Sequence, residues 1–341
     1  MGNGHLLHLI TTRLLGAIPV LLLVTMAIFG LLRLAPGDAA DLLLPDDATD
    51  EQVAETREAW GLDRPIWIQY GQFLSNLARF DLGESYRYRA PVFELIGERL
   101  PATLELSFYA LLLAVVVAVP LGVLAALKKG KTVDAVVSVV AVSGVSAPSF
   151  WVGILLVLFF SGYLNLFPSS GQLPYGVTVP EITGFVTLDA LLSGSWDALY
   201  EGFRYLALPA LTLALAMIGI ISRITRASVI DAGQEEHVFT AVAKGMSRRA
   251  IVRRHLLPNA AIPVVTIIGL ELGALISGSI IVEVVFSWPG IGTLLFQAIS
   301  VRDMPLTTGI VASYTIIFIT LNLLIDIFYV FVDPRLRGSK G

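Results

Sequence analysis

Two glutamates stand in a long apolar stretch of this sequence, where a carboxylate is costly and is usually kept for a function. Glu271 lies near the middle of the stretch over residues 263–282, and Glu283 lies at its end. A carboxylate there could contact a cationic group or carry a proton along a pathway. The alternative for Glu271 is a neutral side chain hydrogen-bonded to a neighbouring helix. For Glu283, as for Glu105 and Asp326 near other boundaries, structural capping or solvation at the interface is favoured.

Small residues surround Glu271 at a spacing typical of helix packing. Gly269 and Gly273 form a GxxxG pair, and Ala274 and Gly278 repeat the same spacing. Such residues allow two helix backbones to approach closely within a membrane. We therefore expect this helix to lie at a helix–helix interface.

No enzymatic constellation accompanies these carboxylates. Gly130-Lys131-Thr132 resembles the end of a P-loop, but Ala125 stands where the first glycine should be, after an apolar stretch rather than a strand. His237 lacks the second histidine of a zinc-protease helix, and no GxSxG elbow occurs. With no cysteine and four scattered histidines, we expect no catalytic residue, no metal site and no cofactor bound by this chain.

The composition is that of a membrane protein. Of 341 residues, 55% are hydrophobic and 15% are charged, against about 25% charged in soluble domains. Six stretches are apolar and long enough to cross a bilayer: 14–32, 106–127, 135–164, 205–222, 263–282 and 304–325. We expect an all-α polytopic protein with six transmembrane helices. The third stretch is too long for one upright helix, so we expect a kink at Pro148.

The basic residues predict the orientation. Three Lys or Arg lie in 128–134, seven in 223–260 and three after Asp333, whereas the opposite loops are acidic or nearly neutral. The positive-inside rule then places both termini in the cytoplasm. The net charge of −4, without a polybasic tail, gives no indication of nucleic-acid binding.

These stretches divide the chain into segments. They are an N-terminal transmembrane helix (1–34), an extracytoplasmic helical segment (35–100), a five-helix core (101–332) with an extracytoplasmic insertion at 163–204 and a cytoplasmic loop at 223–260, and a cytoplasmic tail (333–341). In the extracytoplasmic segment, Asp50 is expected to cap a short helix that ends at Gly61, and Pro65 to open a second one. This pair either lies on the membrane or span ends, or contacts an external partner.

The cytoplasmic loop contains a short apolar helix. Val238, Phe239, Ala241, Val242 and Ala243 are expected to share one broad face, with Thr240 and Lys244 on the other. Gly245 should end this helix, and Ser247 should cap a second one. A groove on another protein or an anionic lipid surface would suit the helix and its neighbouring arginines equally well.

The same loop carries a family resemblance. Residues 240–245, followed after nine residues by His255-Leu256-Leu257-Pro258, resemble the coupling loop E-A-A-x3-G-x9-I-x-L-P of permease subunits of binding-protein-dependent ABC importers. Phe239, Thr240 and His255 depart from the general form. The peptide/nickel branch of these permeases, dipeptide-type members included, largely shares these departures. Further similar motifs lie at 33–38, 61–65, 81–83, 99–106 and 286–292, and their order and spacing make the resemblance specific.

The resemblance implies the type I ABC importer permease architecture in a prokaryotic inner membrane. The chain would pair with a homologous second permease subunit and rest on two cytoplasmic ATPase subunits, which use ATP and Mg, while an extracytoplasmic solute-binding protein delivers the substrate. The loop residues expected to engage an ATPase are Val238, Phe239, Thr240, Ala241, Ala243, Lys244, Gly245, His255, Leu257 and Pro258.

The implied activity is import of dipeptides or oligopeptides without catalysis by this chain. Nickel, glutathione or another small solute is an alternative substrate for the same architecture. The histidines at 5, 8, 237 and 255 are all expected in the cytoplasm or near it, which favours an organic substrate over nickel. An ion-coupled secondary transporter with Glu271 as proton carrier is a second hypothesis, but it leaves the docking loop unexplained.

Overall fold

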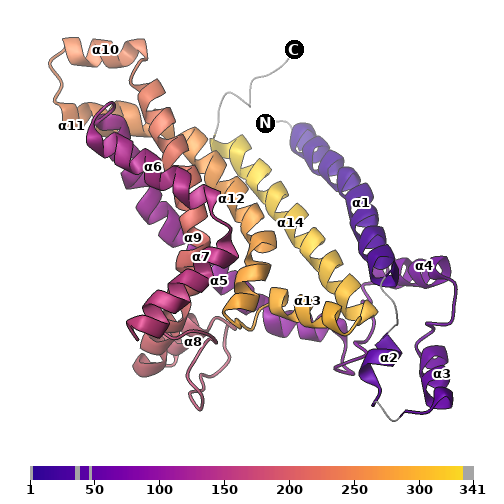
Figure 1. Ribbon diagram of the computed structural model, residues 1–341. Coiled ribbons are helices and arrows are strands. Elements are labelled where there is room, and N and C mark those ends of the chain that lie inside the picture. The colour runs from indigo at the N-terminus through magenta and orange to yellow at the C-terminus, as the bar shows by residue number, and fades with distance from the viewer. Residues whose placement is uncertain (1–2, 35–38, 46–47, 333–341) are drawn as a thin grey trace. The chain divides into compact units, whose positions relative to one another are not determined.

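The computed structural model describes residues 3–34, 39–45 and 48–332 (Figure 1). Within these ranges the regular elements are helices, and β pairing is limited to one isolated bridge between Glu84 and Pro91. The all-α class predicted from the sequence is therefore confirmed.

Among the described residues, five helices are apolar and long enough to cross a membrane. They are α1 (Asn3–Leu34), α5 (Val92–Leu127), α9 (Trp196–Ala232), α12 (Leu257–Val285) and α14 (Met304–Val332). A sixth span arises if the sharply bent pair between α5 and α9 crosses as one unit. The six predicted stretches thus correspond to five long helices and one bent pair.

The bent pair breaks at the predicted proline. α6 (Thr132–Ser146) and α7 (Ser149–Leu156), which continues as the π-helical turn η1 (Val157–Tyr163), meet at 105°. A proline disfavours helical dihedrals in the preceding residue, and Ala147 is extended with φ −89° and ψ 133°. The predicted kink at Pro148 is confirmed, and it is a full break in the helix.

The chain forms two compact units. The first comprises Leu104–Trp288 with the end of α14, and the second comprises the residues up to Thr103 together with Pro289–Thr320. α5 and α14 each contribute residues to both units.

In the first unit, the other helices pack around α9. Its most apolar window is 67% buried within the chain, against 12% to 33% for the other four long helices. α9 contacts α6, α7, α12 and the short helix α8 (Val186–Leu192). A helix so enclosed by its own chain is suited to transmit movement from one end to its neighbours.

Glycines bring three of these helices into backbone contact. A Cβ on Gly219 of α9 would lie 2.3 Å from the carbonyl oxygen of Ala141 on α6, and one on Gly144 would lie 2.8 Å from that of Leu215. Gly122 of α5 would likewise place a Cβ 2.6 Å from the carbonyl oxygen of Ser222. These positions therefore require glycine.

The glycines singled out on α12 behave differently. Gly273 is buried and Gly269 is partly buried, whereas Gly278 is exposed, with nothing within 4 Å of an added Cβ. Gly278 therefore makes no close helix contact within the described part of the chain.

The second unit contains α1, α2 (Ala39–Leu43), α3 (Asp50–Ala59), α4 (Ile66–Leu77) and α13 (Ile291–Ser300). The predicted cap of α3 was one residue late, because Thr49 rather than Asp50 is the N-cap. Thr49 Oγ1 accepts from the Gln52 amide (3.3 Å) while Gln52 Oε1 accepts from the Thr49 amide (2.9 Å), forming a capping box. The predicted end at Gly61, with φ +65°, and the start of α4 after Pro65 are confirmed.

Candidate functional site

The loop between α9 and α12 folds into the two predicted short helices, which Figure 1 shows beyond the ends of α9 and α12. α10 (Glu236–Ala243) ends in a Schellman turn, in which Gly245 N donates to Val242 O (2.9 Å) and Met246 N to Ala241 O (3.2 Å). Gly245 adopts φ +74°, which a glycine accommodates without strain. The predicted end of the helix at Gly245 is therefore confirmed.

The second short helix is tied to α5. Ser247 caps α11 (Arg248–Ile251) by accepting from the Ala250 amide at 3.4 Å, as predicted. Arg248 Nη2 donates to the carbonyl oxygen of Leu127, the last residue of α5, at 2.9 Å. The turn after α10 is thus anchored at both the cap and the arginine.

The apolar residues of α10 divide between two faces. Val238 (7% exposed) and Ala241 (4%) are buried inside the chain, whereas Phe239 (64%) and Val242 (58%) are exposed. The buried pair belongs to a cluster that we call the hinge core: Ala126, Val229, Ala232, Val238, Ala241, Ile251, Leu256 and Ala260. The single broad face predicted from the sequence is therefore wrong in detail, because this chain itself covers half of it.

The remaining loop residues of the predicted site lie on the surface or close to it. Thr240, Ala243 and Lys244 are exposed around the outer face of α10. The π-helical turn η2 (Val252–Leu256) leads into α12, where Leu257 and Pro258 are exposed, and His255 is half-buried in η2. The outer face of α10 and the start of α12 thus both belong to the segment 223–260, which we call the basic loop.

The two glutamates of the spans have different surroundings. Glu283 is fully buried, and its Oε1 accepts from Ser279 Oγ one turn earlier at 3.1 Å. Glu271 is half-buried and has no hydrogen-bond partner within the described part of the chain. Of the two, only Glu283 has a hydrogen bond to a side chain of its own helix.

Glu105 is a structural carboxylate that joins three segments. It is 1% exposed and accepts from the Thr187 amide (2.8 Å), Thr187 Oγ1 (2.6 Å), the Val186 amide (3.2 Å) and Gln172 Nε2 (3.0 Å). The amide donors are the first two N–H groups of α8, which have no partner inside their own helix. Glu105 on α5 thus caps α8 from a distance, in agreement with the capping role favoured from the sequence.

Asp189 organises the chain just before α8. Burial opposes its charged form, but hydrogen bonds from Thr183 Oγ1 (2.6 Å) and from the amides of Thr183, Ile182 and Gly184 outweigh that effect. The pKa of Asp189 is therefore held below its ordinary value. The carboxylate acts as a charged anchor for residues 182–184.

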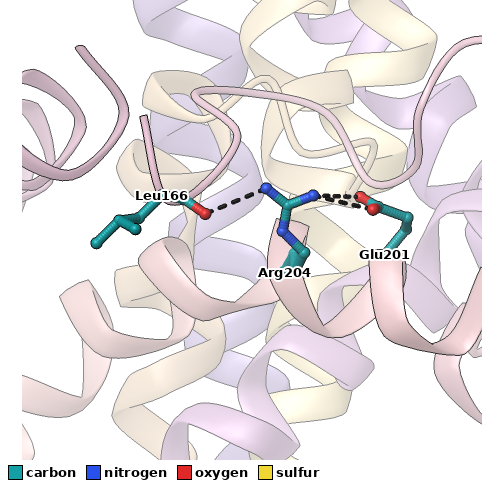
Figure 2. A network of polar contacts seen from close by, with 3 residues as sticks. All are labelled: Leu166, Glu201 and Arg204. Carbon is teal, nitrogen blue, oxygen red and sulfur yellow. Dashed lines mark hydrogen bonds and ion pairs between the residues drawn. The ribbon is translucent and has the colours of Figure 1, made fainter. Parts of the chain in front are cut away.

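An arginine also fastens the insertion to α9. Figure 2 shows Arg204 between the carboxylate of Glu201, at 2.9 and 3.2 Å from Nη1, and the carbonyl oxygen of Leu166, at 3.1 Å from Nη2. The loop that follows η1 is thereby held against the first turns of α9.

The comparisons with known proteins agree with this architecture. Residues 118–338 match the family described as the inner membrane component of binding-protein-dependent transport systems, and residues 6–107 match the N-terminal part of such components. The chain belongs to this family. The larger match contains α10, the hinge core and the whole basic loop.

Relatives of this permease cover nearly its whole length. A probable D,D-dipeptide transport permease, DdpB of Escherichia coli K12, is 39% identical over 310 residues, which are 91% of each chain. A di/tripeptide transport permease, DppB of Pseudomonas aeruginosa UCBPP-PA14, is 39% identical over 336 residues, covering 98% of this chain and 100% of the relative. The permease is thus a multi-pass protein of the inner membrane and a transport subunit.

Solved structures support the same fold. A chain of the MetNI methionine ABC transporter, in an inward-facing conformation, aligns with a TM-score of 0.52 at 18% identity, covering 70% of this permease and 96% of that chain. A chain of an amino acid ABC transporter solved with histidines gives a TM-score of 0.50 at 18% identity, covering 70% and 94%. The predicted type I importer architecture is therefore confirmed as a fold.

Proposed function

We propose that this permease forms half of the translocation pathway of an ATP-driven importer of dipeptides and oligopeptides. It pairs with a homologous second permease and has both termini in the cytoplasm. Two ATPase subunits, which bind ATP and Mg, dock on its basic loop, and an external solute-binding protein delivers the substrate. The permease itself performs no catalysis. The names of its relatives, which specify D,D-dipeptides and di/tripeptides, support this substrate class.

The observation that carries the proposal is the outward pair Phe239 and Val242. Full burial of either side chain is worth about 1.5–3 kcal/mol, so their exposure at 64% and 58% favours a partner. An aromatic residue at the centre of a small patch is typical of an interface hot spot. Lys244, two residues after Val242, and the exposed arginines of the loop are charged residues of the kind that border interface cores.

The hinge core gives the docked helix a route to the spans. Val238 and Ala241 pack with Val229 and Ala232 of α9 and with Ala260 of α12. A push on α10 by a closing ATPase dimer therefore reaches the ends of both spans at once. Packed side chains resist compression, so α9 and α12 should move largely as rigid bodies.

Glu271 is assigned to the pathway because it is a half-buried carboxylate on α12 without a partner in the described chain. A cationic side chain or terminus of a peptide would complement it. Glu283, which accepts a bond from Ser279, is given only a supporting role beside the pathway.

The test is purification of the complex from its native membrane in mild detergent, with mass spectrometry of the proteins that accompany the permease. The unaltered permease should bring a homologous permease and P-loop ATPases. Phe239→Asp should lose the ATPases. The control is Phe93→Asp, which alters a 72% exposed phenylalanine at the start of α5, the end away from Leu127, and this variant should keep them.

Two results would contradict the proposal. One is a permease that purifies without any P-loop ATPase, and the other is a Phe239→Asp variant that retains them fully. Binding of α10 to anionic lipid instead would appear as loss of vesicle binding in the same variant with no change in associated proteins.

A further inference from the structure

Asn259, in the first turn of α12, connects two segments through one side-chain amide. Its Nδ2 donates to the carbonyl oxygen of His255 at 2.8 Å and lies 3.0 Å from Nε2 of His237 on α10. A carbonyl oxygen can only accept, so the amide nitrogen must face this side. Its second N–H then points at His237 Nε2, which must be an acceptor.

This arrangement determines the tautomer of His237. A neutral imidazole whose Nε2 accepts carries its proton on Nδ1. That nitrogen lies 3.1 Å from Oε2 of Glu235, the residue that precedes α10, and the nearby carboxylate favours a proton there. Glu235, His237 and Asn259 therefore form a chain in which each donor faces an acceptor.

These bonds supply something that the hinge core cannot. The contacts of Val238 and Ala241 are apolar and carry no directional preference, so they allow an eight-residue helix to rotate about its axis. The hydrogen bond that His237 accepts from Asn259 of α12 fixes that rotation. It therefore also fixes where Phe239, two positions later, points.

We propose that His237 and Asn259 form a directional clamp that sets the rotation of α10 against α12, so that movement of a docked partner is transmitted to α12 rather than lost in rolling of α10. Both are positioning residues, since neither lies on the outward face that Phe239 and Val242 form. The clamp rests on the proposed docking of α10 on an ATPase. The His237 and Glu235 side chains are 39% and 53% exposed, so the clamp contributes orientation more than stability.

The first experiment compares two substitutions at one position in the assembled transporter. His237→Gln keeps an acceptor near the place of Nε2, whereas His237→Asn reaches only the place of Nδ1. The measured quantity is the amount of peptide imported per ATP hydrolysed. His237→Gln should keep the wild-type ratio, while His237→Asn and Asn259→Leu should lower it several-fold with the ATPases still associated.

Rescue by the conservative variant separates a clamp from a merely structural role. A merely structural role would be disturbed by both His237→Gln and His237→Asn, whereas the clamp is disturbed only by His237→Asn. Equal ratios for His237→Asn, His237→Gln and wild type would overturn the clamp.

A second measurement tests the clamp without any partner. The sequence has no cysteine, so a double variant with Thr240→Cys on α10 and Ala261→Cys on α12 carries one spin label at each of these two positions. The distance distribution should broaden when Asn259→Leu is added, and an unchanged width would overturn the clamp. Absence of ATPases from the wild-type preparation would contradict the proposed function, whereas this distance measurement bears on the clamp geometry alone.

Discussion

Arg226 donates two hydrogen bonds to Asp134, from Nε to Oδ1 at 2.5 Å and from Nη2 to Oδ2 at 2.8 Å. The two residues are 92 positions apart and join α6 to α9. The Gly130 amide also donates to Asp134, at 2.9 Å, so the same carboxylate holds the turn before α6. Since α6 and α9 also touch through Gly144 and Gly219, the pair fixes one end of a close helix contact.

Asp134→Asn should destabilise the permease. The Asp134 side chain is 9% exposed and that of Arg226 30%, so loss of the charge leaves the guanidinium partly buried without its partner. We expect lower stability, seen as a lower thermal midpoint of the purified permease in detergent. Exchanging the charges, with Asp134→Arg and Arg226→Asp together, should recover part of the loss.

The control for this prediction is the exposed pair of Arg57 and Asp41, whose side chains are 41% and 36% exposed. Arg57→Ala should change stability by no more than about 0.5 kcal/mol. Equal effects of Arg57→Ala and Asp134→Asn would mean that the Asp134 pair is no more than a surface contact.

Gly219→Ala should separate α6 from α9. An added methyl group would lie 2.3 Å from the Ala141 carbonyl oxygen, and backbone must move to admit it. Such overpacking costs about 1–3 kcal/mol, measurable in the same thermal assay. Gly278→Ala is the matched control, because it adds the same atom to a helix where nothing lies within 4 Å.

The two glycines also distinguish packing within the chain from packing between chains. In the isolated permease, Gly278→Ala should leave the midpoint unchanged or raise it slightly. If the same change weakens association with a second permease, α12 packs there through its small residues. A Gly219→Ala variant as stable as the wild type would contradict the close contact of α6 and α9.

Glu105→Gln should loosen α8. The neutral amide keeps the size of the side chain but loses the charge that strengthens the bonds from Val186 and Thr187. We expect faster amide hydrogen exchange at the start of α8 and no change at α10. Unaltered exchange at residues 186–187 would show that the carboxylate is not the cap.

Asp189 gives the region before α8 a dependence on pH. Its pKa is lower in the folded than in the unfolded chain, so its charged form favours folding, and this contribution is lost as the pH falls below the ordinary value of 3.8. Protection of the 182–184 amides, corrected for intrinsic exchange, should therefore persist at neutral pH and fall below about pH 4. Asp189→Asn should show the low protection already at neutral pH, and protection equal to wild type would contradict the anchor.

Glu271→Gln tests the pathway assignment. Removal of the charge should lower import of cationic peptides and leave import of neutral peptides nearly unchanged. The measurement is uptake of a matched pair of peptides by the assembled transporter. If both peptides are imported at the wild-type rate, Glu271 does not line the pathway.

Local sequence signals predicted the loop well. Gly245 and Ser247 marked the end of α10 and the start of α11, because their roles depend on neighbours within four residues. The break at Pro148 was predictable for the same reason. The division of the apolar face of α10 was not, because the residues that cover Val238 come from α5, α9 and α12.

The long-range pairs were beyond the sequence patterns. Arg226 was counted as a loop charge, since the apolar stretch ends at 222, whereas α9 continues to Ala232 and Asp134 accommodates the arginine. The glycines of α12 were predicted to pack against another helix because of their GxxxG spacing. Gly219 and Gly144 do make close contacts, but they lie on two different helices, α9 and α6. No regular spacing of glycines within one helix could have revealed them.

The most direct test of the central claim is uptake into proteoliposomes. The permease, purified with its partners and reconstituted with the external binding protein, should import a labelled dipeptide only when ATP and Mg are supplied on the side of the ATPases. Phe239→Asp should abolish this uptake. Uptake by the permease alone, driven by a proton gradient and indifferent to ATP, would contradict the account.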